Sequence, residues 1–336
     1  MITQIVNLNS KIITTEQIAD LSAFLKNVNY LLVFTWQEEG FIKNTQMFLN
    51  AKQTIASNNL TIEINTLDKL EIFEGIDYIV GLGSGKVMDI SKYLAYKHNF
   101  KLTLIPSILS TNAFATDKAC LLEGHKKITL DCKQAETLIF CNEFLSRKNS
   151  SLQTSGVCDV LSIHTALKDW SLAIEKNKDI LNPFTYQFSY QLLNSFLSSY
   201  KDLLSSKKFH SNIIWYLIMS GYITNIHGSG RPESGSEHIF SKVLESAVAV
   251  PHGVSVALGI LIISKLQENE DKRILEAIKA FDLLKDMKKY NITSEIIVES
   301  LLNCQPRKGR YGIFDKVKIE RETAVSIVTS ILKEFQ

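Results

Sequence analysis

The sequence predicts an α/β region with a parallel sheet in the first half of the chain and an all-α region in the second. Up to about residue 150, short apolar stretches alternate with helical patterns, which is typical of parallel strands joined by crossover helices. Beyond that point, strand patterns nearly vanish and long helical patterns follow one another. A chain of 336 residues exceeds what one core usually supports, so two domains are expected, residues 1–150 and 151–336.

Within the first half, three apolar stretches are typical of buried strands: Tyr30–Thr35, Tyr78–Gly83 and Leu102–Pro106. The other expectations here are a capping box at Thr14 and Gln17 that opens a helix, helices over Phe41–Ser57 and Lys86–His98, a strand over Thr61–Asn65, and a hairpin or edge strands within Lys126–Asn142. The segment Arg147–Ser151 is the expected linker. The helices of the second half are expected to start near Val157, Pro183, Ser211, His238 and Val254.

Composition limits the class of protein. A formal net charge of +2 gives no reason to expect nucleic acid or an anionic membrane as a partner. The five cysteines are scattered without a C-x-x-C pair, which favours reduced thiols. No secretory signal pattern opens the sequence, and the longest apolar run, Val254–Ile263, is too short to cross a bilayer. We therefore expect a soluble cytoplasmic protein.

A glycine-rich turn lies between a predicted strand and a predicted helix, in GLGSGKVMDISKYLAY. Gly81, Gly83 and Gly85 would let backbone amides approach a pyrophosphate at the start of the helix, where the dipole also favours an anion. The spacing is neither G-x-G-x-x-G nor that of a P-loop, so the turn could also serve geometry alone. Thr35 and Trp36 stand where a ribose-binding acid would follow the second strand, so the sequence leaves NAD against NADP open.

Two histidines, His238 and His252, lie fourteen residues apart in predicted neighbouring helices. Two imidazoles and one carboxylate can hold a divalent metal with an open coordination position, and Asp159 is the candidate carboxylate. Helix-capping or core histidines are the alternative explanation.

Five segments now occur in one order: GLGSGKVMD, IPSILSTNAFAT, GVCDVLSIHTALKDWSLA, GRPESGSEH and PHGVSVALG. Together they resemble the superfamily of glycerol dehydrogenase, iron-containing alcohol dehydrogenases, 3-dehydroquinate synthase and sn-glycerol-1-phosphate dehydrogenase, the last most closely. The resemblance covers roughly residues 30–259. It implies an N-terminal Rossmann-like dinucleotide-binding domain, a helical metal- and substrate-binding domain (the dehydroquinate synthase-like fold) and an active site in the cleft between them.

By this resemblance, Asp159, His238 and His252 would bind one divalent metal ion, zinc first, with iron or nickel as alternatives. NAD or NADP would contact a set of residues in the two N-terminal segments: Gly83, Ser84, Gly85, Lys86, Val87, Ser107, Ile108, Ser110 and Thr116. The implied chemistry is hydride transfer between the nicotinamide and a metal-bound alkoxide. The family also implies a homodimer or larger homo-oligomer.

The sequence departs from glycerol-1-phosphate dehydrogenases at the substrate side. Asn112 stands where they usually have an aspartate, and Lys242 where they usually have a histidine. Lys242 could bind a phosphate or carboxylate, or it could be a surface lysine. The predicted function is therefore a metal-dependent NAD(P)-linked dehydrogenase of a small polyol phosphate, such as the reductase of dihydroxyacetone phosphate or a related sugar phosphate. The alternatives are a sugar-phosphate cyclase of the 3-dehydroquinate synthase type, a polyol dehydrogenase with a diverged substrate, and a non-catalytic binding protein.

Overall fold

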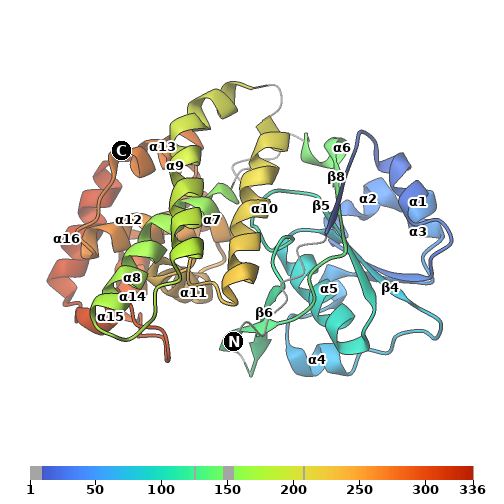
Figure 1. The fold of residues 1–336 in the computed structure, drawn as a ribbon, viewed down its shortest axis with the longest axis horizontal. Helices are drawn as coiled ribbons and strands as arrows, with labels where there is room; N and C mark the ends of the chain where they lie inside the picture. Colours follow the sequence, from blue (N-terminus) through green and yellow to red (C-terminus); the bar gives the residue numbers. More distant parts are fainter. Residues whose placement is uncertain (1–9, 125, 147–154, 207–208, 336) are drawn as a thin grey trace. The chain divides into compact units, whose positions relative to one another are not determined.

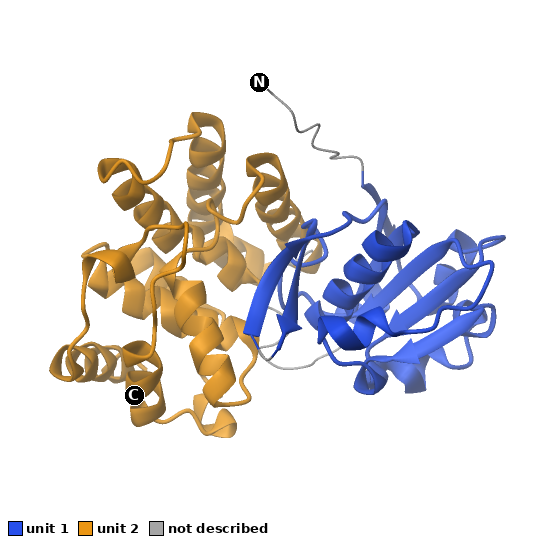
Figure 2. Ribbon diagram, turned by 90° about the horizontal axis from the view of Figure 1, so that it is seen from below, with its two compact units in different colours: residues 1–148 blue, residues 149–336 orange. Residues whose placement is uncertain are grey.

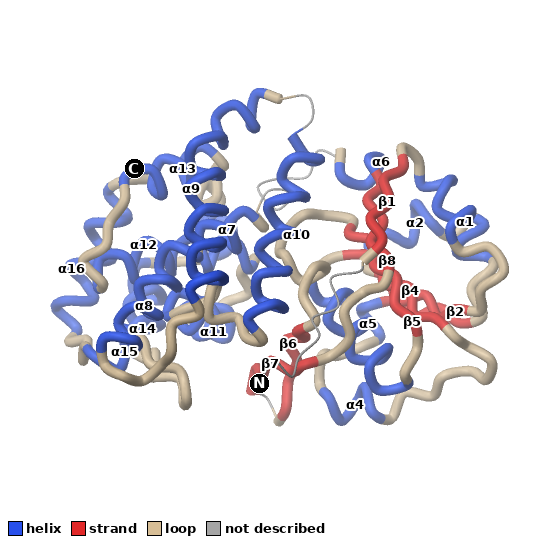
Figure 3. The backbone as a smooth tube through the Cα atoms, viewed as in Figure 1, coloured by secondary structure: helices blue, strands red, loops and turns tan. Residues whose placement is uncertain are grey.

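The structure, a computed structural model, describes residues 10–124, 126–146, 155–206 and 209–335. The chain divides into two compact units, residues 1–148 and 149–336 (Figure 2). The first unit contains the strands, and the described part of the second is built of helices without a strand (Figure 3). The predicted fold class, a parallel α/β region followed by a helical region, is confirmed. The linker predicted over Arg147–Ser151 lies outside the described residues.

The first unit is organised around a sheet of six strands in the order β1-β8-β5-β4-β2-β3 (Figure 1). Every neighbouring pair in this sheet is parallel. Its strands are β1 (Lys11–Thr15), β2 (Tyr30–Phe34), β3 (Gln53–Ala56), β4 (Tyr78–Gly83), β5 (Lys101–Pro106) and β8 (Thr137–Cys141). A separate antiparallel hairpin consists of β6 (Lys118–Glu123) and β7 (Lys126–Asp131).

Helices of the first unit cover the sheet because its strands are apolar on both faces. On one face, alternate residues of β2 (Tyr30, Leu32 and Phe34) join one buried cluster with Leu21 and Met47. On the opposite face, α5 packs closely on β4. The helices of this unit are α1 (Leu21–Phe24), α2 (Glu39–Ile42), α3 (Gln46–Leu49), α4 (Ile64–Asp68), α5 (Gly85–His98) and α6 (Asn142–Leu145), with short 3₁₀ turns at Ile18–Asp20, Trp36–Glu38 and Ser57–Asn59.

The close packing of α5 depends on a missing side chain. A Cβ on Gly81 of β4 would lie 2.4 Å from Ser91 Oγ of α5. The strand order also reverses beside this strand: the chain leaves β2 to form β3 on one side and returns to form β4 on the other. In parallel sheets, ligands bind outside the carboxyl ends of the strands at such a switch point. The glycine turn that follows β4 is at this place.

Three local predictions for the first unit are wrong. Thr14 does not cap a helix, because it lies in β1 and pairs with Phe140 of β8. The helix predicted over Phe41–Ser57 is split into α2, α3 and β3, since β3 pairs with the open edge of β2. The predicted strand Thr61–Asn65 makes a single bridge, between Glu63 and Leu122, before α4 begins. In the first two places, the pairing of distant segments overrides the local pattern.

The second unit is helical, as its long apolar patterns predict. Its helices are α7 (Val157–Leu161), α8 (Ile163–Glu175), α9 (Pro183–Ser205), α10 (Phe209–His227), α11 (Ser236–Ala247), α12 (His252–Leu266), α13 (Lys272–Ala280), α14 (Ser294–Leu302), α15 (Ile313–Lys316) and α16 (Arg321–Lys333). The five cysteines are free thiols. A search of the described residues finds no helix with the length and apolarity needed to cross a bilayer.

Candidate metal centre and cofactor turn

Three helices of the second unit bring Asp159, His238 and His252 together. Asp159 is the third residue of α7, His238 the third of α11 and His252 the first of α12. One ligand atom from each lies within 4.8 Å of the others. The Nε2 atoms of His238 and His252 lie 3.8 and 3.6 Å from Asp159 Oδ1, and the two ring centroids are 5.5 Å apart. We call these three residues the metal cluster.

Each histidine of the metal cluster is oriented by a glutamate at its other ring nitrogen. His238 Nδ1 lies 2.7 Å from Glu237 Oε1, and His252 Nδ1 lies 2.8 Å from Glu245 Oε1. A carboxylate only accepts, so Nδ1 carries a proton in both rings and Nε2 is the atom that faces Asp159. Carboxylates in this position fix the tautomer and ring orientation of metal-binding histidines. The donor set therefore suits a divalent metal.

Both glutamates are held in turn. Glu245 Oε1 accepts hydrogen bonds from Ser241 Oγ at 2.8 Å and from Ser255 Oγ at 2.7 Å. Glu237, which is fully buried, accepts a bond of 2.6 Å from Thr165 Oγ1 of α8. Such multiple bonds keep the carboxylates charged inside the protein and leave them little freedom to turn.

Close packing of the helices also fixes the positions of the metal-cluster residues. A Cβ on Gly259 of α12 would lie 2.6 Å from Glu237 O of α11, so the glycine lets the two helices approach. Gly253, next to His252, is as constrained, because a Cβ there would lie 2.3 Å from Ser155 Cβ. The positions of the two histidines are therefore set by backbone packing as well as by hydrogen bonds.

The electrostatics of the cluster favour a bound cation. Burial alone would raise the pKa of Asp159, but His238 and His252 lower it far below its usual value. Burial also opposes the charged form of His252, yet Asp159 and Glu245 raise its pKa to about 10. Because of this raised pKa, a metal ion that binds at Nε2 of His252 has to displace a proton from that ring. The metal-free cluster thus holds a proton where a divalent cation would satisfy the same carboxylates.

Glu233 is a further, partly buried carboxyl near the cluster. Its Oε2 accepts a hydrogen bond of 2.6 Å from Ser220 Oγ. Burial, and then the charge of Asp159, raise the pKa of Glu233 to about 7. Ser162, at the junction of α7 and α8, ties the two residues together by donating to Asp159 O at 3.1 Å and to Glu233 O at 2.6 Å.

In the first unit, the glycine turn lies at the switch point of the sheet. Thr35, directly after β2, donates its N–H to Leu82 O at 2.9 Å, and its Oγ1 accepts from Ser84 N at 3.1 Å. Gly83 has a φ of 153°, and a Cβ there would lie 1.9 Å from Thr35 Oγ1. Only glycine fits this position. The turn leads directly into α5, whose N-terminal residues include Gly85, Lys86 and Val87.

The second predicted cofactor segment lies beside this turn. Ser107 N donates to Gly83 O at 3.0 Å, and a Cβ on Gly85 would lie 3.0 Å from Thr111 Cγ2. The structure thus brings the turn together with the stretch after β5, which contains Ser107, Ile108 and Ser110. A glycine turn at the start of a helix, beside a second loop, is the kind of cradle a pyrophosphate occupies.

Two polar side chains of the predicted cofactor set have structural partners. Lys86 Nζ donates to Ser57 O at 2.7 Å and to Leu60 O at 2.6 Å, and burial lowers its pKa. Thr116 is buried; its hydroxyl lies 3.4 Å from Lys92 Nζ and 3.2 Å from Lys118 O. In this structure they support the loops, so a cofactor role for Lys86 would come from its backbone.

The predicted substrate residues lie in different units. Asn112 is buried in the loop after β5, where its carbonyl accepts from Ala115 N at 2.8 Å. Lys242 is one turn after His238 on α11, and residues four apart share a helix face.

The sequence analysis did not identify the two orienting glutamates, Glu237 and Glu245, as site residues. The signals were a glutamate directly before His238 and another seven residues from each histidine, but acidic residues at such spacings are common on helices. His164, by contrast, is engaged outside the cluster, with Nε2 2.6 Å from Asn269 O.

Comparisons with known proteins agree with this architecture. Residues 42–143 match the family described as iron-containing alcohol dehydrogenase. A glycerol-1-phosphate dehydrogenase (NAD(P)+) of Staphylothermus marinus is 30% identical over 260 residues, which cover 76% of this chain and 73% of the relative. That of Methanocorpusculum labreanum is 25% identical over 81% of this chain and 76% of its own. The solved structure of a probable glycerol dehydrogenase from Sinorhizobium meliloti superposes with a TM-score of 0.70 at 15% identity, over 96% of each chain.

A parallel sheet with a glycine turn at its switch point, together with a helical unit that carries two histidines and an aspartate, defines the class of metal-dependent, nicotinamide-linked alcohol dehydrogenases. The identity of 30% over most of the chain then narrows the class. This chain belongs to the family of iron-containing alcohol dehydrogenases and glycerol-1-phosphate dehydrogenases.

Proposed function

We propose that this protein is an NAD(P)-linked, metal-dependent dehydrogenase that interconverts a small polyol phosphate and its carbonyl compound. Glycerol 1-phosphate and dihydroxyacetone phosphate are the first pair to test. The main evidence is the metal cluster, in which one ligand atom each of Asp159, His238 and His252 lies within 4.8 Å of the others. The relatives named glycerol-1-phosphate dehydrogenase support the substrate class.

The donor set of the proposed centre favours zinc. Two imidazole nitrogens and one carboxylate oxygen are a common three-ligand set of catalytic zinc, which leaves a position for substrate. The metal, when bound there, acts as a Lewis acid toward an alcohol or carbonyl oxygen. Iron and nickel also accept this set, so metal analysis of the purified protein decides between them.

The residues around the cluster have separable tasks in this proposal. Glu237 and Glu245 hold the Nδ1 protons of His238 and His252 and keep both Nε2 atoms facing Asp159. Ser84 and Gly85 bind the pyrophosphate through backbone amides at the start of α5. Lys242, on the face of α11 that carries His238, binds the phosphate of the substrate. Asn112 is the second candidate for substrate recognition.

The test is a spectrophotometric assay. The metal-loaded protein is mixed with NADH or NADPH and with dihydroxyacetone phosphate, dihydroxyacetone or short sugar phosphates, each with and without a chelator. We expect NADH or NADPH to be oxidised when a phosphorylated ketone is present. This oxidation should stop when the metal is chelated and resume when metal is added back. Asp159→Ala should be inactive, whereas His164→Gln, which replaces a histidine outside the cluster, should remain active. Full activity of metal-free protein would refute the proposal.

Two other outcomes identify the alternatives. Oxidation of the reduced cofactor only with an unphosphorylated carbonyl compound, such as dihydroxyacetone, would indicate a dehydrogenase with a diverged substrate. Tight cofactor binding without net oxidation of any compound would instead favour a cyclase, which returns the cofactor to its starting state, or a silent binding protein.

We further propose a cytoplasmic homo-oligomer. Five free cysteines suit a reducing compartment. Large apolar side chains are exposed on α9 and α10, among them Phe184, Tyr190 and Trp215, and a second copy of the chain could cover them. Light scattering of the purified protein measures the assembly.

A further inference from the structure

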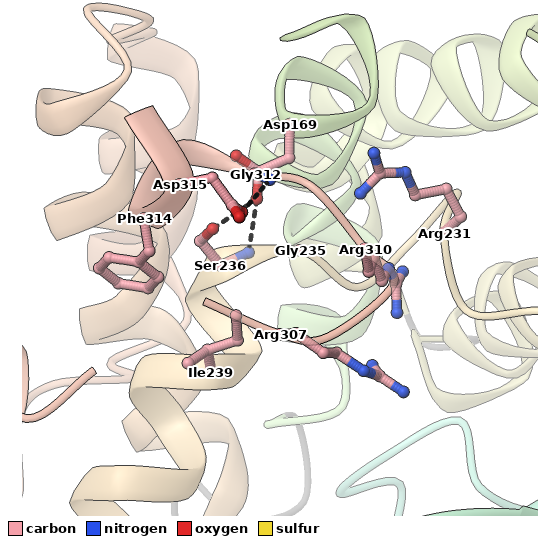
Figure 4. A pocket seen from close by; sticks show the side chains of 10 residues that line it. All are labelled: Asp169, Arg231, Gly235, Ser236, Ile239, Arg307, Arg310, Gly312, Phe314 and Asp315. Atoms are coloured by element: carbon pink, nitrogen blue, oxygen red, sulfur yellow. Dashed lines mark hydrogen bonds between the residues drawn. The ribbon is translucent and has the colours of Figure 1, made fainter. Parts of the chain in front are cut away.

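A small pocket of the second unit lies apart from the metal cluster and is rich in arginine. Its lining includes Arg231, Arg307 and Arg310, and the pocket is partly open to solvent. Figure 4 shows the three arginines on one side of this pocket, with Asp169 and Ser236 on the other. We call it the arginine pocket.

Two of the three arginines contribute buried nitrogen atoms that make no hydrogen bond to any described residue. Arg231 is 3% exposed; its Nε lies 2.9 Å from Asp179 Oδ2, but its buried Nη2 has no hydrogen-bond partner in the described parts of the chain. Arg310 donates from Nη2 to Ser234 O, while its buried Nε makes no hydrogen bond to the residues that the structure describes. A buried cationic donor without an acceptor is costly, and native proteins seldom leave one.

At Arg310, the charges of the neighbouring arginines add to this cost. Burial, followed by the charges of Arg307 and Arg231, lowers the pKa of Arg310 to about 9. Burial likewise lowers the pKa of Arg231. Arg307 is exposed at the pocket, so a third guanidinium is available from the solvent side.

The acidic residues of the pocket have other partners. Asp169 accepts four hydrogen bonds: from Ser236 N at 2.7 Å, Ser236 Oγ at 2.6 Å, Gln267 Nε2 at 2.8 Å and Ile313 N at 2.9 Å. Asp315 Oδ2 accepts from Gly312 N at 2.9 Å, at the start of α15. Asp179 lies beside Nε of Arg231, which leaves Nη2 of that arginine without an acceptor. Among the described residues, none therefore accepts a hydrogen bond from Nη2 of Arg231 or Nε of Arg310.

We propose that the arginine pocket binds a small oxyanion of the phosphate class through Arg231, Arg307 and Arg310. Guanidinium groups present paired donors that match the oxygens of phosphate, and several of them around one pocket are typical of phosphate recognition. The shared chemistry is a tetrahedral phosphate oxyanion, either free inorganic phosphate or the phosphate group of a small metabolite.

This site goes beyond the proposed function because it is not where the substrate would bind. Ser236 and Ile239 of α11 line the arginine pocket, whereas His238 of the same helix belongs to the metal cluster and Glu245 of this helix orients His252. At 3.6 residues per turn, these two pairs of residues point about 140° apart around the helix axis. One helix thus separates the two sites.

The arginine pocket is nevertheless connected to the metal cluster through the start of α11. Arg310 holds Ser234 O, and the next turn carries Glu237 and His238. A Cβ on Gly235 would lie 2.9 Å from both Asp169 Oδ2 and Glu237 Oε2, so this segment has little room to move. An anion that fixes Arg310 would stabilise the segment that positions the first histidine.

The test is titration of the metal-loaded, full-length protein with inorganic phosphate, at constant ionic strength set with chloride. Isothermal calorimetry and the shift in Tm are both recorded. Since phosphate could also bind at the cofactor or substrate position, the assignment rests on arginine variants. We expect Arg310→Gln to weaken phosphate binding at least tenfold and Arg307→Gln severalfold, with a smaller gain in Tm in both.

Arg307→Gln is the variant that keeps the test decisive, because Arg307 is exposed and its loss should not prevent folding. Arg321→Gln is the matched control, since Arg321 is an exposed arginine on α16 that pairs with Glu295 and Glu299. His252→Ala should bind phosphate like the wild-type protein, which separates this inference from the proposed function. The inference is overturned if phosphate binds no better than chloride, or if the Arg307 and Arg310 variants bind it as the wild type does.

Discussion

The two candidate sites of this protein are built by different parts of the chain. In the metal cluster, side chains define the site: three ligands and two orienting glutamates come from α7, α11 and the start of α12. At the glycine turn, the absence of side chains defines the site, because Gly83 and Gly85 leave room beside Thr35 and Thr111. A site of the first kind should be sensitive to the chemistry of a replacement. A site of the second kind should be sensitive to its size.

The largest effect is expected from removing a ligand. His252→Ala should lower kcat/KM by about three orders of magnitude or more, roughly 4 kcal/mol, because the proposed Lewis acid is lost. Metal content per chain should fall with activity, while cofactor affinity stays near the wild-type value. His164→Gln serves as the control for loss of an imidazole. Undiminished metal content in His252→Ala would contradict the assignment of this ligand.

The partly buried carboxyl of Glu233 beside the cluster should make stability depend on pH. The pKa of Glu233 is raised from 4.5 to about 7 in the folded protein, so the folded state binds more protons than the unfolded state between these values. Its contribution is complete below about pH 4.5 and is lost as the pH rises through 7. The total is at most about 3 kcal/mol. Urea unfolding of metal-free protein across this range should show a steeper loss for the wild type than for Glu233→Gln. Parallel curves would refute this prediction.

A smaller effect is expected when a ligand is kept but its partner is changed. Glu245→Gln retains a hydrogen-bond acceptor for His252 and removes the charge, so the metal Kd should rise about 10- to 100-fold. A competition titration with a chromophoric chelator measures this. Glu276→Gln, which changes an exposed glutamate on α13, is the matched control. Equal metal affinities of the two variants would mean that the orienting carboxylate contributes little.

The glycine turn should respond to a single methyl group. Gly83→Ala places a Cβ against Thr35 Oγ1 at a φ of 153°, and we expect roughly 1–3 kcal/mol of strain. NADH affinity should fall about tenfold while metal affinity does not change, in contrast to His252→Ala. Gly40→Ala is the control, because a Cβ there meets nothing within 4 Å. Quenching of protein fluorescence by NADH measures the NADH affinity of both variants. Undiminished NADH binding by Gly83→Ala would argue against a pyrophosphate at this turn.

Sequence alone predicted those parts of the fold in which local pattern and tertiary environment agree. The run Tyr78–Gly83, the glycines and the helix that follows form one continuous strand-turn-helix unit, and each local preference is satisfied within it. Residues 41–57 failed because β3 exists only through pairing with the edge of β2, which no helical or apolar pattern in that segment records. The same reason explains the region of Thr14, where pairing with β8 replaces a helix start.

For the candidate site, the sequence indicated residue types but not their environment. The three residues of the metal cluster could be selected by type and by resemblance, and the structure places them together. Glu237 and Glu245 could not, because their role depends on rings, hydroxyls and carbonyls supplied by other helices. The arginine pocket was missed for the same reason, since Arg231 and Arg310 are far apart in the chain and meet only in the folded unit.

The placement of the three ligands on α7, α11 and α12 also has a consequence for metal retention over time. Asp159 is far in the chain from the two histidines, so a fragment that contains only α11 and α12 keeps two of the three ligands and binds the ion much more weakly. Release of the metal should therefore be all-or-none and should coincide with separation of these helices. A dye that reports free metal would then record the unfolding rate of the second unit, and the ion itself becomes a probe of its kinetic lifetime.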